Sequence, residues 1–109
     1  MLYTCADDFY QQAFAIKRIT REDEIEYAKL MKENDSAARQ AIINGYIPIV
    51  AARIRRLPKE YQSLELIYRC IDILERTVDM FNFLQEGETF LHTLSVRLQP
   101  VITRYVVSR

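Results

Sequence analysis

An apolar side chain recurs every three or four residues through the C-terminal half of the chain, and this period constrains the fold more than any other feature. One stripe consists of Ile67, Ile71, Leu74, Val78 and Phe81. A second has the same period and consists of Phe90, Leu94, Leu98, Val101 and Tyr105. Side chains at these spacings lie on one face of an α-helix. With only two glycines and three prolines among 109 residues, the chain has few turn residues for a sandwich or barrel.

Short polar side chains mark where the helices are expected to begin. Thr20, Asp35, Ser63 and Thr89 each precede a helical run, and such side chains can accept hydrogen bonds from the first turn of a helix. A further helix is expected within residues 1–18. Because a chain of this length usually forms one domain, we predict an all-α, compact bundle of about five helices in a single domain that spans residues 1–109.

A glycine and two prolines predict interruptions. Gly45 and Pro48 predict a break around residues 44–47 and a new helix over about Tyr46–Arg56, because proline cannot donate to the helical ladder but is tolerated in a first turn. One kinked helix is the alternative. Pro100 falls within the last expected helix and predicts that this helix is kinked or split. The helix that begins after Thr20 is expected to end near Asn34.

The residues typical of enzymes and metal sites are missing. His92 is the only histidine, and Gly45 and Gly87 are isolated, so the sequence has no glycine-rich phosphate loop. Cys5 and Cys70 are widely separated and match no metal-ligand spacing. We therefore expect no enzymatic activity, no cofactor and no metal.

The acids and bases of the chain balance at fifteen each, so the formal net charge is zero. A dedicated nucleic-acid binder is usually basic overall, and this balance disfavours strong autonomous DNA binding. Four acids crowd the start of one expected helix, where we attribute them to the helix dipole and a solvated face. They are Glu22, Asp23, Glu24 and Glu26.

The sequence predicts a cytoplasmic protein. Its two cysteines are expected to be reduced thiols. The longest apolar runs fall short of the roughly 18 residues that a membrane span requires. Asp7 and Asp8 stand near the N-terminus, where a signal peptide would carry positive charge and then an apolar stretch.

Two groups of basic residues could bind an anion. The first lies at the end of an expected helix and consists of Arg53, Arg55, Arg56 and Lys59. Phosphate contact, an acidic partner and simple complementation of the helix dipole are all compatible with it. The second is the segment after Glu88, which contains no acid but retains Arg97 and Arg104, seven residues apart on one helix face. Nucleic-acid binding and ordinary solvation both account for this basic face.

Two stretches of the chain, read together, follow the residue pattern of one protein family. The first consists of residues 19–29 (ITREDEIEYAK), 33–39 (ENDSAAR), 42–43 and 47–50 (IPIV). The second consists of residues 64–67 (LELI), Leu74, Arg76, Val78, Phe81, Asn82, Gly87, Phe90 and 102–104 (ITR). Together they resemble the second conserved region of bacterial RNA polymerase sigma factors. Their order and spacing match the family over residues 19–105, with one extra residue between Phe81 and Gly87. No helix-turn-helix domain of the kind that normally follows in the family lies within this sequence.

The resemblance implies a compact helical bundle that docks on the RNA polymerase core and a last helix that reads and melts promoter DNA. Positions matching the polymerase-binding surface read Glu65, Tyr68, Arg69 and Ile71. The expected partner-binding residues are Glu65, Tyr68 and Arg69, to which we add Glu75 from the same helix. Only Glu65 keeps the family's residue type, and Arg69 reverses a charge, which disfavours docking on a complementary surface.

The positions matching the family's DNA-contacting surface are also changed. Family aromatics that stack on unpaired bases are replaced by Thr93, Val96 and Arg97, although Phe90 remains. Thr103 and Arg104 match positions that contact duplex DNA, so the expected DNA-binding residues are Phe90, Arg97, Thr103 and Arg104.

Two functions follow from the resemblance and its departures. The first is a divergent sigma-like transcription initiation protein that binds RNA polymerase and promoter DNA. The second is a protein-interaction module with a sigma-like fold, which regulates a sigma factor or polymerase without melting DNA. Its partner would be a sigma factor, an anti-sigma factor or polymerase.

Overall fold

A computed structural model describes residues 2–108, and these residues form an all-α bundle with five α-helices. The helices are α1 (Ala6–Ala13), α2 (Arg21–Met31), α3 (Ser36–Arg55), α4 (Leu64–Met80) and α5 (Phe90–Val107), with a short 3-10 helix, η1 (Lys59–Tyr61), before α4. The predicted fold class is therefore confirmed. None of the helices within residues 2–108 is long and apolar enough to cross a membrane.

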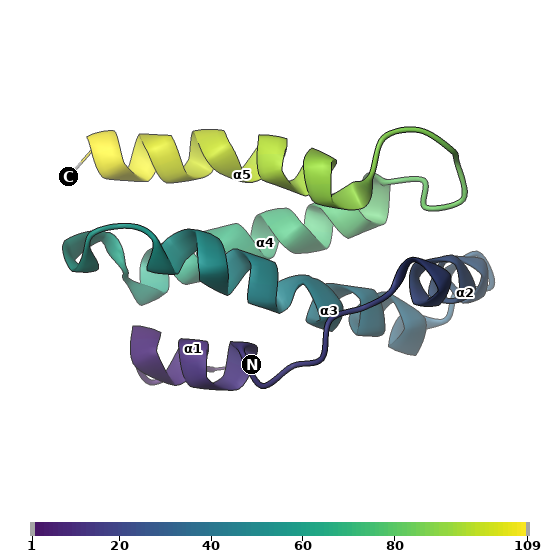
Figure 1. Cartoon of the computed structure of the whole chain (residues 1–109), viewed down its shortest axis with the longest axis horizontal. Coiled ribbons are helices and arrows are strands. Elements are labelled where there is room, and N and C mark those ends of the chain that lie inside the picture. The colour runs from purple at the N-terminus through teal and green to yellow at the C-terminus, as the bar shows by residue number, and fades with distance from the viewer. Residues whose placement is uncertain (1, 109) are drawn as a thin grey trace.

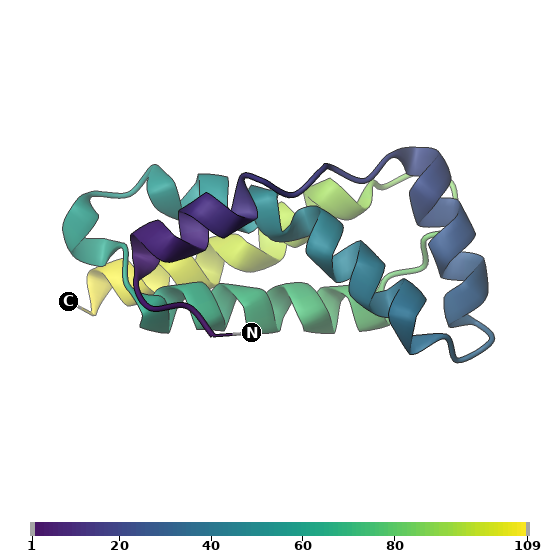
Figure 2. The same cartoon turned by 90° about the horizontal axis from the view of Figure 1, so that it is seen from below.

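The bundle is elongated, with extents of 41 × 25 × 20 Å. Figure 1 shows α5 above α4, with α3 below them and α1 on the side of α3 that is remote from α5. In Figure 2, α2 runs across one end of the bundle, while α4 and α5 run along its length in opposite directions. The strongest helix contacts are those of α3 with α4, α4 with α5, and α2 with α3.

All four predicted N-caps form. Thr20 and Asp23 make a reciprocal capping box at the start of α2, and Asp35 accepts hydrogen bonds from two backbone N–H groups of α3. Ser63 and Thr89 each accept one bond from the third residue of their helix. Each cap satisfies backbone donors that the first turn leaves unpaired.

The predicted break in the third helix is wrong, because α3 runs without interruption through Gly45 and Pro48. Gly45 serves a different purpose. A Cβ atom at this position would lie 2.7 Å from the Cβ of Ile19, so glycine lets the segment before α2 approach the α3 backbone. The predicted split at Pro100 is also absent, since α5 continues to Val107.

Two other helices are shorter than predicted. The helix expected within residues 1–18 covers only Ala6–Ala13. The helix after Thr20 ends at Met31 rather than near Asn34, and a turn follows in which Asn34 adopts a left-handed backbone (φ 64°). Asparagine tolerates this conformation better than most residues. Gly87, in the loop before α5, has a φ of 109°, a backbone conformation that glycine adopts without steric cost.

The core joins the predicted stripes of α4 and α5 to α3 and α1. Its fully buried side chains include Phe9, Ile42, Val50, Ile54, Ile67, Leu74, Leu94 and Leu98. At the end nearest α2, an aromatic cluster fills the space between α3, α4 and the loop before α5. This cluster consists of Tyr46, Phe81, Phe83 and Phe90, whose neighbouring rings lie 4.6–5.4 Å apart between centroids.

Candidate nucleic-acid and partner interfaces

Two arginines of α4 and two of α5 form a group that we call the arginine seam: Arg69, Arg76, Arg97 and Arg104. Arg69 and Arg104 border the same shallow pocket between the two helices, together with Asp72. The Arg97 guanidinium donates a hydrogen bond of 3.1 Å to Thr77 Oγ1, one residue beyond Arg76. Within each helix the two arginines are seven residues apart, which corresponds to about 10 Å along the axis. Because α4 and α5 are antiparallel (Figure 2), the seam has two arginines at either end.

Acids neutralise the seam only on its α4 side. Arg69 pairs with Glu65 at 2.7 Å and Arg76 pairs with Asp72 at 3.0 Å. On the α5 side, neither Arg97 nor Arg104 lies within ion-pair distance of an acid in residues 2–108. Arg104 is exposed, whereas Arg97 is half-buried against Thr77 and Met80. The two arginines predicted to share one face therefore both border α4.

The two other residues predicted to contact DNA have different positions. Thr103 is exposed, and its hydroxyl accepts a hydrogen bond from the amide of Gln99. Phe90 is only 2% exposed, since its ring packs in the aromatic cluster against Tyr46 and Phe83. The ring of Phe90 therefore has almost no solvent-exposed surface on which a base could stack, and its contact with DNA stays a prediction.

The four residues predicted to bind a partner separate into two sides of α4. Glu65 and Arg69 are exposed and pair with each other. Tyr68 and Glu75 instead line a groove of about 260 Å³ between α3 and α4, whose floor includes Ile43, Ile47 and Ile71. Tyr68 is half-buried because the N-terminal segment crosses it: the backbone N–H of Tyr3 donates to its hydroxyl at 2.9 Å, and the two rings stack.

The basic group at the end of α3 does not form a single cluster. Arg53 points to α5, where it donates to the side-chain oxygen of Gln99 at 2.6 Å. Arg55 points to α1 and lies over the rings of Tyr10 and Phe14. Lys59 lines the same cavity as Arg55. Arg56 is exposed and does not line that cavity.

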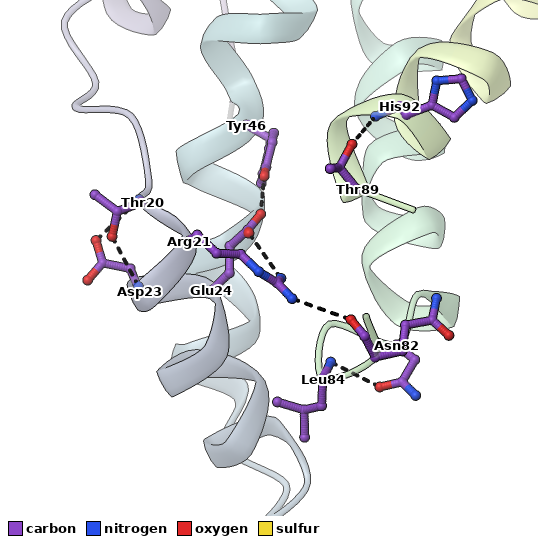
Figure 3. A network of polar contacts seen from close by, with 10 residues as sticks. Thr20, Arg21, Asp23, Glu24, Tyr46, Asn82, Leu84, Thr89 and His92 are labelled. Carbon is purple, nitrogen blue, oxygen red and sulfur yellow. Dashed lines mark hydrogen bonds and ion pairs between the residues drawn. The ribbon is translucent and has the colours of Figure 1, made fainter. Parts of the chain in front are cut away.

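A partly buried polar network connects α2 and α3 to the loop that leads into α5 (Figure 3). Glu24 accepts a hydrogen bond from the hydroxyl of Tyr46 and forms an ion pair with Arg21. Arg21 also donates a hydrogen bond to the backbone carbonyl of Gln85. Burial, and then the hydrogen bond to Glu24, raise the pKa of Tyr46. Glu24 is 6% exposed, so attributing it to a solvated face is wrong. Its partner lies 22 residues away, a separation that helix periodicity does not encode.

Among the described residues, no group of three acidic, histidine or cysteine side chains is arranged to hold a metal. No protein-family model matches the chain, and neither a curated protein nor a solved structure shows a significant match to it.

Proposed function

We propose that the chain is a divergent sigma-like transcription initiation protein that binds the RNA polymerase core and promoter DNA in the cytoplasm, without enzymatic activity. The arginine seam is the observation that supports DNA binding most directly. Guanidinium groups form bidentate hydrogen bonds to phosphate, and two of the four seam arginines have no acid partner within residues 2–108.

The seam favours duplex DNA over melted strands. Its cations suit contacts to the phosphate backbone, which orient a protein on DNA without reading the sequence. The exposed hydroxyl of Thr103 stands one residue from Arg104 and adds a donor to the same helix. Since Phe90 is buried, α5 lacks this ring as a stacking surface for unpaired bases, which elsewhere contributes about 1–3 kcal/mol per base.

The exposed ridge of α4 supports the polymerase half of the proposal. Glu65, Arg69, Asp72 and Arg76 present alternating charges along it. An interface of this kind steers a partner with complementary charge and rejects one with like charge. Tyr68 and Glu75 flank the ridge on the α3 side.

The test is binding of a fluorescent promoter duplex to the double variant Arg97→Ala/Arg104→Ala. Loss of two phosphate contacts should weaken binding at least tenfold at low salt, and similarly for unrelated sequences. The matched control is Lys29→Gln/Lys32→Gln, which removes two positive charges from exposed positions of the α2 region and should leave affinity within about twofold. Equal affinity of the wild type and the arginine variant would remove DNA from the proposal.

The groove between α3 and α4 favours a second candidate, a protein-interaction module that regulates a sigma factor or polymerase. It combines an apolar floor with the carboxylate of Glu75, which forms no ion pair within the described residues. In a pull-down with core polymerase, sigma factor and anti-sigma factor, Glu75→Lys should weaken capture about tenfold or more if the groove is the interface. Glu86→Lys, in the exposed loop before α5, is the control. Retained capture by Glu75→Lys would exclude this groove.

A further inference from the structure

A cavity of about 500 Å³ opens between α1 and the end of α3, and it contains one cation, Arg55, that lies over two aromatic rings. Arg55 and Lys59 line one wall, Tyr10 and Phe14 line another, and Gln62 and Asp7 complete it. The volume falls within the range of small-molecule sites. Figure 1 shows α1 and α5 on opposite sides of α3, so this cavity is separate from the arginine seam.

The guanidinium of Arg55 is held in place by the rings beside it. Its central carbon lies 5.9 Å from the ring centroid of Tyr10 and 5.4 Å from that of Phe14. Stacking of this kind stabilises a cation while leaving the N–H groups at its edge available for hydrogen bonds. Arg55 forms no ion pair with an acid in the described part of the chain.

The guanidinium of Arg55 is also not used to cap the last carbonyl groups of its own helix. Basic side chains at a helix C-terminus commonly bond the last carbonyl groups. Here the amide of Gln62 does so instead, donating 3.2 Å to the carbonyl of Arg55 and 2.6 Å to that of Leu57. The side-chain oxygen of Gln62 accepts a 2.7 Å bond from the Tyr10 hydroxyl. These three bonds fix α1 against the end of α3 and leave the guanidinium facing the cavity.

The charge balance of the cavity is positive. Arg55 and Lys59 stand against the single carboxylate of Asp7, and neither cation pairs with it. A planar fork of donors beside a point charge suits a phosphate group, because the fork binds two oxygens and the ammonium adds a second charge-assisted contact.

We propose that this cavity binds a phosphate group, carried either by a small phosphorylated metabolite or by a nucleic-acid strand. Arg55 and Lys59 hold the phosphate, and the cavity beyond them accommodates the group that carries it. Phe14, which is 44% exposed, offers an apolar surface at the rim to that group.

The experiment is a titration of the isotopically labelled protein followed by two-dimensional NMR. The probes are inorganic phosphate, adenosine monophosphate, a short oligothymidylate, and acetate as a carboxylate of lower charge. We expect saturable shifts at Phe14, Lys59 and Gln62 with at least one phosphate probe, and weaker binding of acetate. Saturation by the two small probes identifies a free metabolite, whereas saturation by the oligonucleotide alone identifies a strand. Absence of saturable shifts at these residues with every phosphate probe would overturn the proposal.

Variants distinguish specific binding of phosphate in the cavity from nonspecific attraction of an anion to positive charge. Lys59→Gln should weaken binding about fivefold or more, because it removes a charge-assisted contact, and its exposed side chain makes no ion pair whose loss would unfold the protein. Arg55→Lys keeps the charge but loses the fork, and it should weaken binding as well. Arg56→Gln removes the same charge just outside the cavity and should change affinity less than twofold. Equal losses in Lys59→Gln and Arg56→Gln would contradict a site at this cavity.

Discussion

The contact between Arg39 and Asp79 shows how single residues tie distant ends of the helices together. Two nitrogens of Arg39, near the start of α3, donate to both carboxylate oxygens of Asp79, near the end of α4, at 2.6 and 2.9 Å. These hydrogen bonds lower the pKa of Asp79. Both side chains remain partly exposed, at 34% and 52%, so solvent limits what the pair contributes to stability.

This pair predicts a stability difference that depends on pH. A carboxyl group whose pKa is lowered by folding stabilises the protein above its unfolded pKa, near 3.8, and that stabilisation is lost as pH falls through the folded pKa. A double-mutant cycle of Arg39→Gln and Asp79→Asn, measured by urea unfolding, should give a coupling of about 0.5–1 kcal/mol at pH 7. The coupling should fall towards zero as the pH falls through the lowered pKa of Asp79. A coupling that stays constant while this carboxyl group becomes protonated would refute the ionic origin.

At the scale of the element, Gly45 separates helix propensity from packing. Alanine is the better helix former by about 1 kcal/mol, yet its Cβ would meet Ile19 atoms at 2.7 and 2.9 Å. Overpacking costs about 1–3 kcal/mol. We expect Gly45→Ala to destabilise the protein by up to about 2 kcal/mol in thermal or chemical unfolding.

Removing the Ile19 atoms that would clash with a Cβ at position 45 should abolish or reverse the destabilisation caused by Gly45→Ala. Both Cβ and Cγ2 of Ile19 are absent in Ile19→Gly. In that background Gly45→Ala should be neutral or stabilising by up to about 1 kcal/mol. If Gly45→Ala destabilises both backgrounds equally, Ile19 is not the reason for the glycine.

Pro100 is expected to weaken the helix in which it lies. It lacks the N–H that would bond to the carbonyl four residues earlier, and its ring crowds that turn. Because Pro100 is exposed, little packing is lost on replacement. Pro100→Ala should raise the free energy of unfolding by about 1–3 kcal/mol. Pro48→Ala, at a buried position of α3, should gain less because the ring there packs in the core. A loss of stability in Pro100→Ala would indicate that the ring is needed in α5.

The whole molecule shows which features the sequence could predict. Caps and apolar stripes act within a few residues, so the fold class and all four N-caps were predictable. Gly45 was misinterpreted because its reason, Ile19, lies in another segment. The burial of Glu24 and of Phe90 likewise depends on residues in other segments, since both contact Tyr46 of α3. The basic group at the end of α3 is visible in the sequence, but only the packing of α1 shows that Arg55 and Lys59 share a cavity while Arg53 points to α5.

Zero net charge makes the salt dependence of DNA binding a measure of the arginine seam. With no overall positive charge to attract DNA, counterion release should come from the two seam arginines that lack an acid partner, Arg97 and Arg104. If both contact duplex phosphates, the logarithm of the affinity should fall with the logarithm of salt concentration with a slope of about −1.8. Arg97→Ala/Arg104→Ala should bring the slope close to zero, while Lys29→Gln/Lys32→Gln should leave it unchanged. A slope near zero in the wild type, or equal slopes in the wild type and the arginine variant, would place DNA contacts elsewhere.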